Sequence, residues 1–135
     1  MAVAPYLAIV DARRALVFYS AAFGAEIFDL VEHENGCVVH AKMRLAGAVV
    51  MVHEHIAGEV VGIDAPSLGG HSSVTIRCGL ETAAEVDALI ERAVRHGAEV
   101  TAGPAVMRWG EYYGRLRDPF AHIWAFGAPA APRND

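Results

Sequence analysis

The stretch PYLAIVDARRALVFYSAAFGAE, residues 5–26, contains the pattern that decides the fold. It begins with a short apolar run, which is typical of a buried strand. Asp11 follows, and its carboxylate can accept a hydrogen bond from a free amide in the first turn of a helix. From Leu16 to Phe23 apolar residues recur at helical spacing, and Gly24 can adopt the positive φ with which many helices end. The stretch therefore predicts a strand that leads directly into an amphipathic helix.

Three extended segments follow this helix. Asn35-Gly36 separates the first from the second, and Ala46-Gly47 separates the second from the third. Both pairs indicate turns, and Asn-Gly is especially frequent in tight hairpins. The expected strands cover residues 26–31, 37–44 and 48–55.

The second half of the chain repeats this order. Residues 72–80, SSVTIRCGL, alternate apolar and polar side chains as on a two-faced strand. Thr82 and Glu85 have the spacing of a capping box, in which the hydroxyl and the carboxylate each accept a bond from a free amide. The helix ends at Gly97. Its buried stripe is predicted to comprise Val86, Leu89, Ile90, Ala93 and Val94. Further strands are expected near 99–107, 111–117 and 122–127.

Both halves therefore have the order βαβββ, and we expect the 135 residues to form a single domain of two modules. Module one covers about 4–56, a connection covers 57–71, module two covers about 72–127, and a Pro- and Ala-rich tail covers 128–135. The connection contains apolar residues that pack over a cleft mouth or a partner chain, or else locally beneath the loop. These are Val60, Val61 and Ile63.

Composition excludes several classes of protein. The formal net charge is −5 and the eleven basic residues form no clustered run, which argues against a nucleic-acid partner. No segment has the roughly 18–20 apolar residues of a membrane helix, and the N-terminus lacks the basic segment of a signal peptide. We expect a cytoplasmic protein. Cys37 and Cys78 are too few for a disulfide framework and are interpreted as small core residues.

The repeat and its motifs resemble the vicinal oxygen chelate superfamily, which includes glyoxalase I, the bleomycin resistance proteins and the extradiol dioxygenases. The resemblance is strongest to the PhnB-like branch. Residues 5–26 resemble its opening strand and helix, His40-Ala41 its second strand pair, and WGEYYGRLRDPFAHIW at 109–124 its C-terminal signature, where the family usually has Gly in place of Ala121. The resemblance implies an α+β fold in which two βαβββ modules form a curved mixed sheet, a cup, with the helices on its outer face. It also implies a homodimer.

Metal-dependent members of this superfamily bind a divalent ion with one His or Glu from each of four strands. The corresponding positions in this chain are occupied by Ala4, Met51, Thr75 and Ala125. A methyl group, a thioether and a neutral hydroxyl are poor ligands for such an ion, so no cofactor is expected. A less favoured alternative is a divalent metal at His53 and His55, which alternate on one strand face but lack a third protein ligand.

The cup is predicted to bind a small organic molecule instead, of aromatic or anionic character. Arg77 either meets a ligand carboxylate or phosphonate or pairs with an acid such as Glu111. Trp109 and Tyr113 either stack on a planar ligand or pack in the core. The candidate ligand-binding residues are Tyr6, Met51, His53, Thr75, Arg77, Trp109 and Tyr113.

Three other residues are interpreted as structural. His40 and His122 are expected to form hydrogen bonds with backbone carbonyls near the hairpins. Asp118, followed by a proline, is expected to form the tight turn before the last strand.

Three functions remain open at this point. The favoured one is metal-independent binding of a small molecule, as in drug-sequestering resistance proteins. The second is a lyase, isomerase or dioxygenase that uses a metal or acid–base groups, and the third is a structural or regulatory dimer without a ligand. The sequence identifies neither the ligand nor any catalytic residue.

Overall fold

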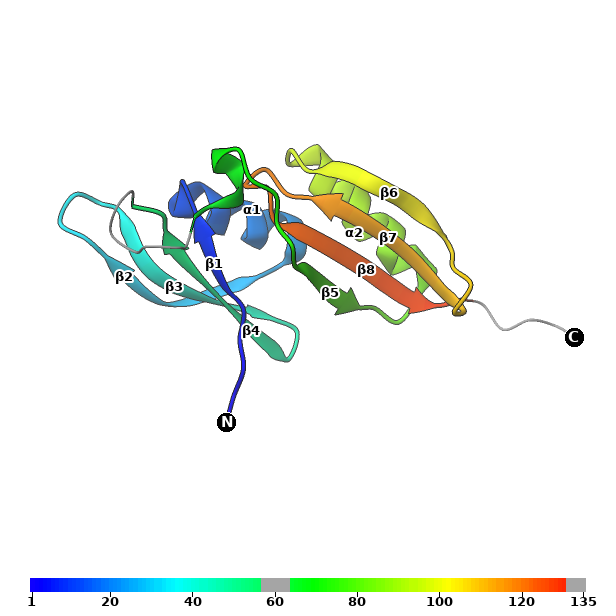
Figure 1. Cartoon of the computed structure of the whole chain (residues 1–135). Helices are drawn as coiled ribbons and strands as arrows, with labels where there is room; N and C mark the ends of the chain where they lie inside the picture. The colour runs from blue at the N-terminus through cyan, green and yellow to red at the C-terminus, as the bar shows by residue number, and fades with distance from the viewer. Residues whose placement is uncertain (57–63, 131–135) are drawn as a thin grey trace, which may run out of the picture. The chain divides into compact units, whose positions relative to one another are not determined.

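The computed structural model describes residues 1–56 and 64–130, so the predictions for Val60, Val61 and Ile63 lie outside the described residues. The chain divides into two compact units, Met1–His71 and Ser72–Asp135. From here on the names module one and module two denote these two units. Each contains a strand, a helix and three further strands in that order, as predicted (Figure 1). In the part of the chain that the structure describes, no helix is long and apolar enough to cross a membrane.

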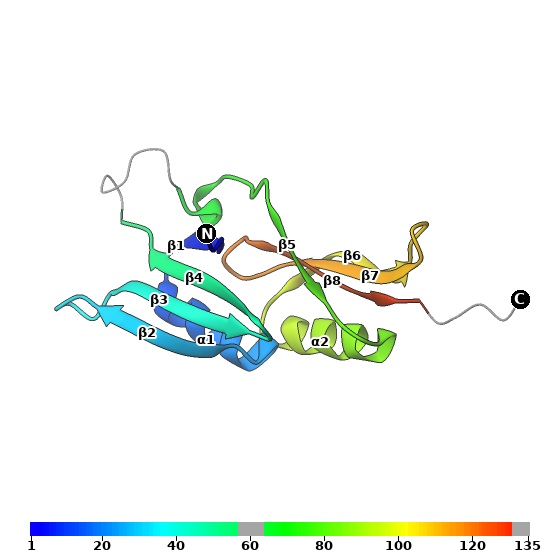
Figure 2. The ribbon, with the colours of Figure 1, turned by 90° about the horizontal axis from the view of Figure 1, so that it is seen from below.

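Module one has a four-stranded mixed sheet with one helix against it (Figure 2). The strand order is β1-β4-β3-β2, in which β1 runs parallel to β4 and the other neighbours are antiparallel. A short 3₁₀ helix, Pro66–Leu68, lies in the described part of the connection. The elements are β1 (Tyr6–Ile9), α1 (Ala12–Phe23), β2 (Glu26–Glu32), β3 (Val38–Leu45) and β4 (Ala48–Glu54).

Helix α1 begins and ends as the sequence predicts. Asp11 Oδ1 accepts a hydrogen bond from the backbone amide of Arg14 at 3.2 Å. At the other end Gly24 has φ 70° and its amide donates to Ser20 O, so the residue type that tolerates a left-handed conformation occupies the position that needs it. A second cap was not predicted: Glu54 Oε2, from the end of β4, accepts a bond from the amide of Ala12 at 3.0 Å.

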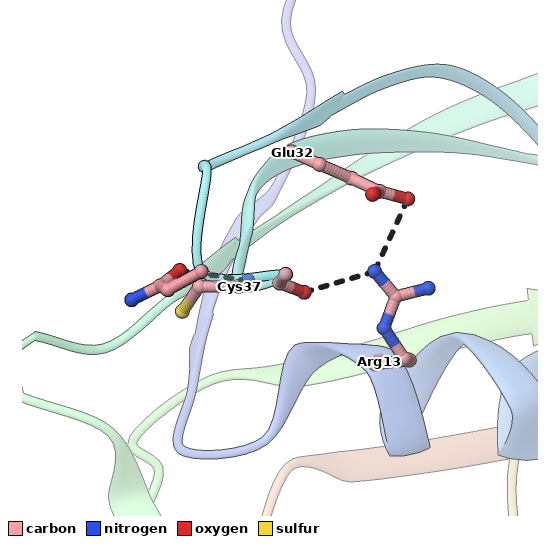
Figure 3. A network of polar contacts seen from close by, with 5 residues as sticks. Arg13, Glu32 and Cys37 are labelled. Atoms are coloured by element: carbon pink, nitrogen blue, oxygen red, sulfur yellow. Dashed lines mark hydrogen bonds and ion pairs between the residues drawn. The ribbon is translucent and has the colours of Figure 1, made fainter.

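Arg13 connects α1 to the β2–β3 hairpin (Figure 3). Its Nη2 atom donates to the carbonyl of Gly36 at 2.9 Å and lies 3.1 Å from Glu32 Oε1. At the hairpin tip the side chain of Asn35 accepts a bond from the amide of Cys37 at 3.0 Å, an Asx turn that fits the predicted Asn-Gly signal. One guanidinium therefore fixes the helix against the connection between two strands.

Module two repeats the arrangement. Its sheet has the order β5-β8-β7-β6, with β5 parallel to β8, and α2 packs on β6, β7 and β8. The elements are β5 (Thr75–Gly79), α2 (Ala83–Arg95), β6 (Glu99–Val106), β7 (Glu111–Arg117) and β8 (Ile123–Pro129). Thr82 caps α2, since its hydroxyl oxygen accepts a bond from the amide of Glu85 at 3.2 Å. The hydroxyl also donates to the Glu85 carboxylate.

Three predictions for module two were wrong, one about a buried residue and two about where a strand begins or ends. Val94 is 44% exposed, and the buried residues of α2 are Val86, Ile90 and Ala93. Val74 lies before β5 and is 63% exposed. The predicted tail begins too early, because Ala128 and Pro129 still belong to β8 and pair with β7.

Candidate functional site

The structure brings the three site candidates of module one together on the sheet face opposite α1. Tyr6 lies opposite Met51 across the β1–β4 ladder, and Ala8 lies opposite His53, so the four residues share a face. The ring of Tyr6 also meets the ring of His53 edge-on, with centroids 4.8 Å apart. Tyr6 is 50% exposed, so its ring is accessible from outside the module.

His40 belongs to the same cluster, which corrects a prediction. Its Nδ1 atom lies 2.8 Å from the hydroxyl of Tyr6, whereas the sequence led us to expect a backbone carbonyl as its partner. The strand register explains the contact: Ala41 pairs with Val52, so His40 on β3 lies next to His53 on β4. The alternation of residues along β3 and β4 was readable from the sequence, but their mutual register was not.

The hydrogen bond of His53 fixes which of its nitrogens is available. Nδ1 lies 3.1 Å from the carbonyl oxygen of Glu54, and because a carbonyl only accepts, Nδ1 must carry the proton. In the neutral ring Nε2 is then the acceptor. His55 lies beyond the end of β4, and its amide donates to Ile9 O. Among residues 1–56 and 64–130 no three His, Cys, Asp or Glu side chains are grouped to bind a metal ion.

The four positions that the resemblance assigns to a metal offer little to a divalent ion. In module one, Ala4 precedes β1 and Met51 presents a thioether next to Tyr6. In module two, Thr75 begins β5 with a neutral hydroxyl, and Ala125 in β8 is 0% exposed. Hard and borderline cations require carboxylate or imidazole ligands, so these residues do not fit the family's metal.

In module two Thr75, Arg77 and Tyr113 lie on the sheet face away from α2, which we call the open face, and Trp109 lies in the turn before β7 at the edge of this face. Gly114 contacts Ile90 of α2 and Leu116 is fully buried, so the alternate residues of β7 point to the other side. Cross-strand pairing adds Arg77 and Ala125 of the neighbouring strands to this side. On β5, β7 and β8 the open face comprises Thr75, Arg77, Gly79, Glu111, Tyr113, Arg115, Arg117, Ile123, Ala125 and Gly127, and on β6 it includes Glu99, opposite Arg117.

Arg77 forms an ion pair with Glu111, through Nη2 and Oε2. This confirms the second of the two roles that the sequence left open for Arg77. The Glu111 side chain is only 17% exposed and the Arg77 side chain is 51% exposed. The carboxylate lies directly over Gly127, where a Cβ atom would come within 2.5 Å of Glu111 Cδ. A glycine in β8 therefore makes the space in which the acid lies.

Glu111 also positions the aromatic candidates. Its Oε1 atom accepts a hydrogen bond from the indole of Trp109 at 3.4 Å, and the rings of Trp109 and Tyr113 meet edge-on with centroids 5.7 Å apart. Trp109 is nevertheless 66% exposed, so it is not a core residue, whereas Tyr113 is partly buried. The hydroxyl of Tyr113 accepts bonds from Arg115 Nε at 3.3 Å and Nη2 at 3.0 Å.

Two ionisable groups of module two have shifted pKa values. Burial raises the pKa of the Cys78 thiol to about 11, and the charge of Arg77 opposes this shift in part. Tyr112 points toward α2, where its hydroxyl donates to Asp87 Oδ1 at 2.6 Å, and this bond raises the pKa of Tyr112. Neither group is poised to lose its proton near neutral pH, so neither is a candidate nucleophile or base.

The sequence and the fold identify the family. Residues 3–126 match the model of the Glyoxalase/Bleomycin resistance protein/Dioxygenase superfamily. The chain belongs to this superfamily. The resemblance drawn from its repeat and motifs is therefore confirmed.

Individual relatives agree with this assignment. Uncharacterized protein Mb0911c of Mycobacterium bovis is 36% identical over 98% of this chain and 86% of its own length. A PhnB protein of Bacillus cereus superposes with a TM-score of 0.74, at 17% identity, over 97% of this chain and 100% of that one. A mutant of the fosfomycin resistance protein FosX of Listeria monocytogenes, complexed with Mn(II) and a dihydroxypropylphosphonic acid, gives 0.73 at 18% identity, over 96% and 90%. The two structures show that the fold is shared.

Proposed function

We propose that the protein binds a small planar organic molecule on the open face of module two, without a metal ion at Ala4, Met51, Thr75 or Ala125. The observation that carries the proposal is the Trp109–Tyr113 ring pair, in which Trp109 is exposed and Tyr113 is partly buried. Aromatic rings held next to a carboxylate and a guanidinium provide both stacking surface and directional polar groups.

The pair is held in place before any ligand arrives. The indole N–H of Trp109 is bonded to Glu111, and Glu111 is in turn held by Arg77. Tyr113 lies within β7, where Arg115 holds its hydroxyl. These bonds restrict the two side chains in part, so a ligand that stacks on the rings avoids some of the entropy cost of binding.

Family membership supports a small-molecule ligand and leaves its identity open. The superfamily includes resistance proteins, and FosX is complexed with a small organic acid and Mn(II). The methyl, thioether and hydroxyl groups at the four strand positions favour drug sequestration, which requires no metal, over metal-dependent turnover.

Calorimetric titration with 2-naphthamide, a neutral planar probe, tests this proposal. We expect binding that Trp109→Ala weakens about three- to tenfold, because a stacked aromatic pair contributes at this level. Val94→Ala, an exposed apolar residue on α2, is the matched control and should leave the affinity unchanged. Absence of binding, or an equal loss in both variants, would refute the proposal, and so would binding that requires added Mn²⁺.

A second function is favoured by the Tyr6–His40 contact in module one. A phenol bonded to an imidazole, next to a His53 ring with Nε2 available, is a suitable arrangement for acid–base chemistry. An assay of glutathione hemithioacetals, catechols and epoxides would support an enzyme if activity fell in Tyr6→Phe and in His53→Ala. Activity lost only on chelation would instead indicate a metal enzyme.

We also propose that the protein is a cytoplasmic homodimer, as the family resemblance suggests. Among the described residues neither cysteine forms a disulfide, which is usual in a reducing compartment. Sedimentation at micromolar concentration should give twice the chain mass of 14.4 kDa, and a monomer would contradict the proposal. A dimer that binds no ligand, the third function considered, would show no heat with 2-naphthamide.

A further inference from the structure

Two arginines on the open face of module two have no acid partner. Arg115 and Arg117 lie in β7, and within the described residues neither forms an ion pair, whereas Arg77 is neutralised by Glu111. Glu99 lies opposite Arg117 in the β6–β7 ladder, yet the two side chains do not pair. A guanidinium stays charged at all physiological pH values, and neither of these two is in contact with a carboxylate among the described residues.

Both arginines point to the same side of the sheet. They are two positions apart on one strand, with the buried Leu116 between them pointing toward α2. Their Cα atoms are therefore about 7 Å apart, a spacing that lets two long side chains converge on one group. Ala125, which pairs with both Arg77 and Arg115, is 0% exposed, as expected of a small residue covered by longer neighbours.

Unsatisfied hydrogen-bond donors remain at this place. Arg117 Nε is buried and has no partner among the described residues. The Tyr113 oxygen already accepts two bonds from Arg115, so its own hydrogen is free to be donated outward. A buried donor without an acceptor is costly, and an oxygen-rich anion would satisfy it once the Arg117 side chain turns to expose that atom.

We propose that Arg115, Arg117 and the Tyr113 hydroxyl form an oxyanion site for a carboxylate or phosphate group of the ligand. This inference rests on the proposed function for its premise that the open face binds a small molecule, and it adds the charge of that molecule. The sequence offered Arg77 as a possible contact for an anionic ligand. In the structure Arg77 is instead paired with Glu111, so the proposed site uses other residues. In a chain of net charge −5, two neighbouring guanidinium groups that form no ion pair among the described residues also attract anions.

Three probes that share one ring system and differ in head group separate the contribution of the head group to the affinity from that of the ring. These are 2-naphthamide, which is neutral, 2-naphthoate and 2-naphthyl phosphate, each titrated calorimetrically into the full chain. We expect at least one anion to bind about tenfold more tightly than the amide, as hydrogen bonds to charged groups contribute at this level. The comparison of the two anions shows whether the site prefers a carboxylate or a phosphate.

Variants test whether the two arginines cause this preference. Arg117→Gln should abolish this preference and leave the affinity for the amide within about twofold. Arg115→Gln should also abolish the preference; because Arg115 holds the Tyr113 hydroxyl, this variant is judged by the ratio of its anion and amide affinities. Arg95→Gln in α2 makes the same change in net charge away from the open face and should preserve the preference. An equal loss in Arg95→Gln would overturn the inference, because it would show only an effect of net charge.

A measurement on the unaltered protein covers the case in which Arg117→Gln fails to fold. The Nε–H resonance of Arg117 should shift on addition of the preferred anion and not on addition of 2-naphthamide. An unshifted resonance, or equal affinity for all three probes, would overturn the oxyanion site while leaving the proposed function intact. If inorganic phosphate binds through both arginines and 2-naphthamide does not bind, the oxyanion site stands and the proposed function fails.

Discussion

The carboxylate of Asp118 accepts a hydrogen bond from the indole of Trp124 in the core of module two, with 2.8 Å between Oδ2 and Nε1. Its other oxygen accepts bonds from the backbone amides of Phe120 at 2.8 Å and His122 at 3.0 Å. Asp118 is 2% exposed, so this buried acid is satisfied by at least three donors. The turn that the sequence assigned to Asp118 is confirmed, and the bond to Trp124 adds a connection from the turn to the core.

Replacing Asp118 should therefore destabilise the protein strongly. Asp118→Ala leaves three buried donors without their acceptor, and we expect a loss of about 2–4 kcal/mol in the free energy of unfolding. Asp118→Asn retains one acceptor oxygen and should lose less. Urea denaturation followed by circular dichroism measures both, with Glu91→Ala on the exposed side of α2 as control. A loss from Asp118→Ala no larger than that of the control would contradict this account.

Ala121 occupies a backbone conformation that favours glycine. Its φ is 69°, and its amide donates to Asp118 O at 3.0 Å within the same turn. A left-handed conformation costs a residue with a Cβ about 1–2 kcal/mol, which the greater freedom of an unfolded glycine offsets in part. Ala121→Gly should thus raise the midpoint of urea denaturation, equivalent to about 0.5–1 kcal/mol. A lower midpoint would show that the turn is not strained in solution.

Local patterns determined how much of the fold was predictable. The helices could be located because their caps are encoded within a few residues, as at Asp11 and Thr82. The hairpins could be located because Asn35-Gly36 and Ala46-Gly47 interrupt the strands. Position 121, where the family usually has Gly, has a positive φ in the structure.

The candidate sites depend on contacts between strands, which local patterns do not encode. The Tyr6–His40 contact depends on the mutual register of β1, β4 and β3. Separately, β2 contains an irregularity at Asp29, with φ 50°, that no sequence motif predicts. The Arg77–Glu111 pair was foreseen only as one alternative, because its formation depends on the space above Gly127. Side-chain rotamers and cross-strand neighbours therefore set the limit of the sequence prediction.

Cys78 should make stability depend on pH in the alkaline range. Burial raises its pKa from 9.0 to about 11, so the folded protein holds the thiol proton more tightly than the unfolded chain does. This contribution is fully present below pH 9 and is lost as pH rises toward 11, by about 2–3 kcal/mol in total. Urea denaturation at pH 8 and pH 10.5 should show a smaller decrease in Cys78→Ala than in the unaltered protein. Equal decreases in the two would show that the thiol is not buried in solution.

Gly127 and Glu111 should be energetically coupled. In Gly127→Ala the new methyl group would collide with the Glu111 carboxylate, so the acid must leave its place and lose its bonds to Arg77 and Trp109. We expect a loss of about 1–3 kcal/mol in the free energy of unfolding, the usual cost of overpacking. In a Glu111→Ala background there is no carboxylate to collide with, and the same glycine substitution should cost less. Gly103→Ala in β6 is the matched control, because a Cβ there meets nothing within 4 Å. A double-mutant cycle from urea denaturation should give a coupling of at least about 0.5 kcal/mol, whereas additive losses would mean that Glu111 does not lie over Gly127 in solution.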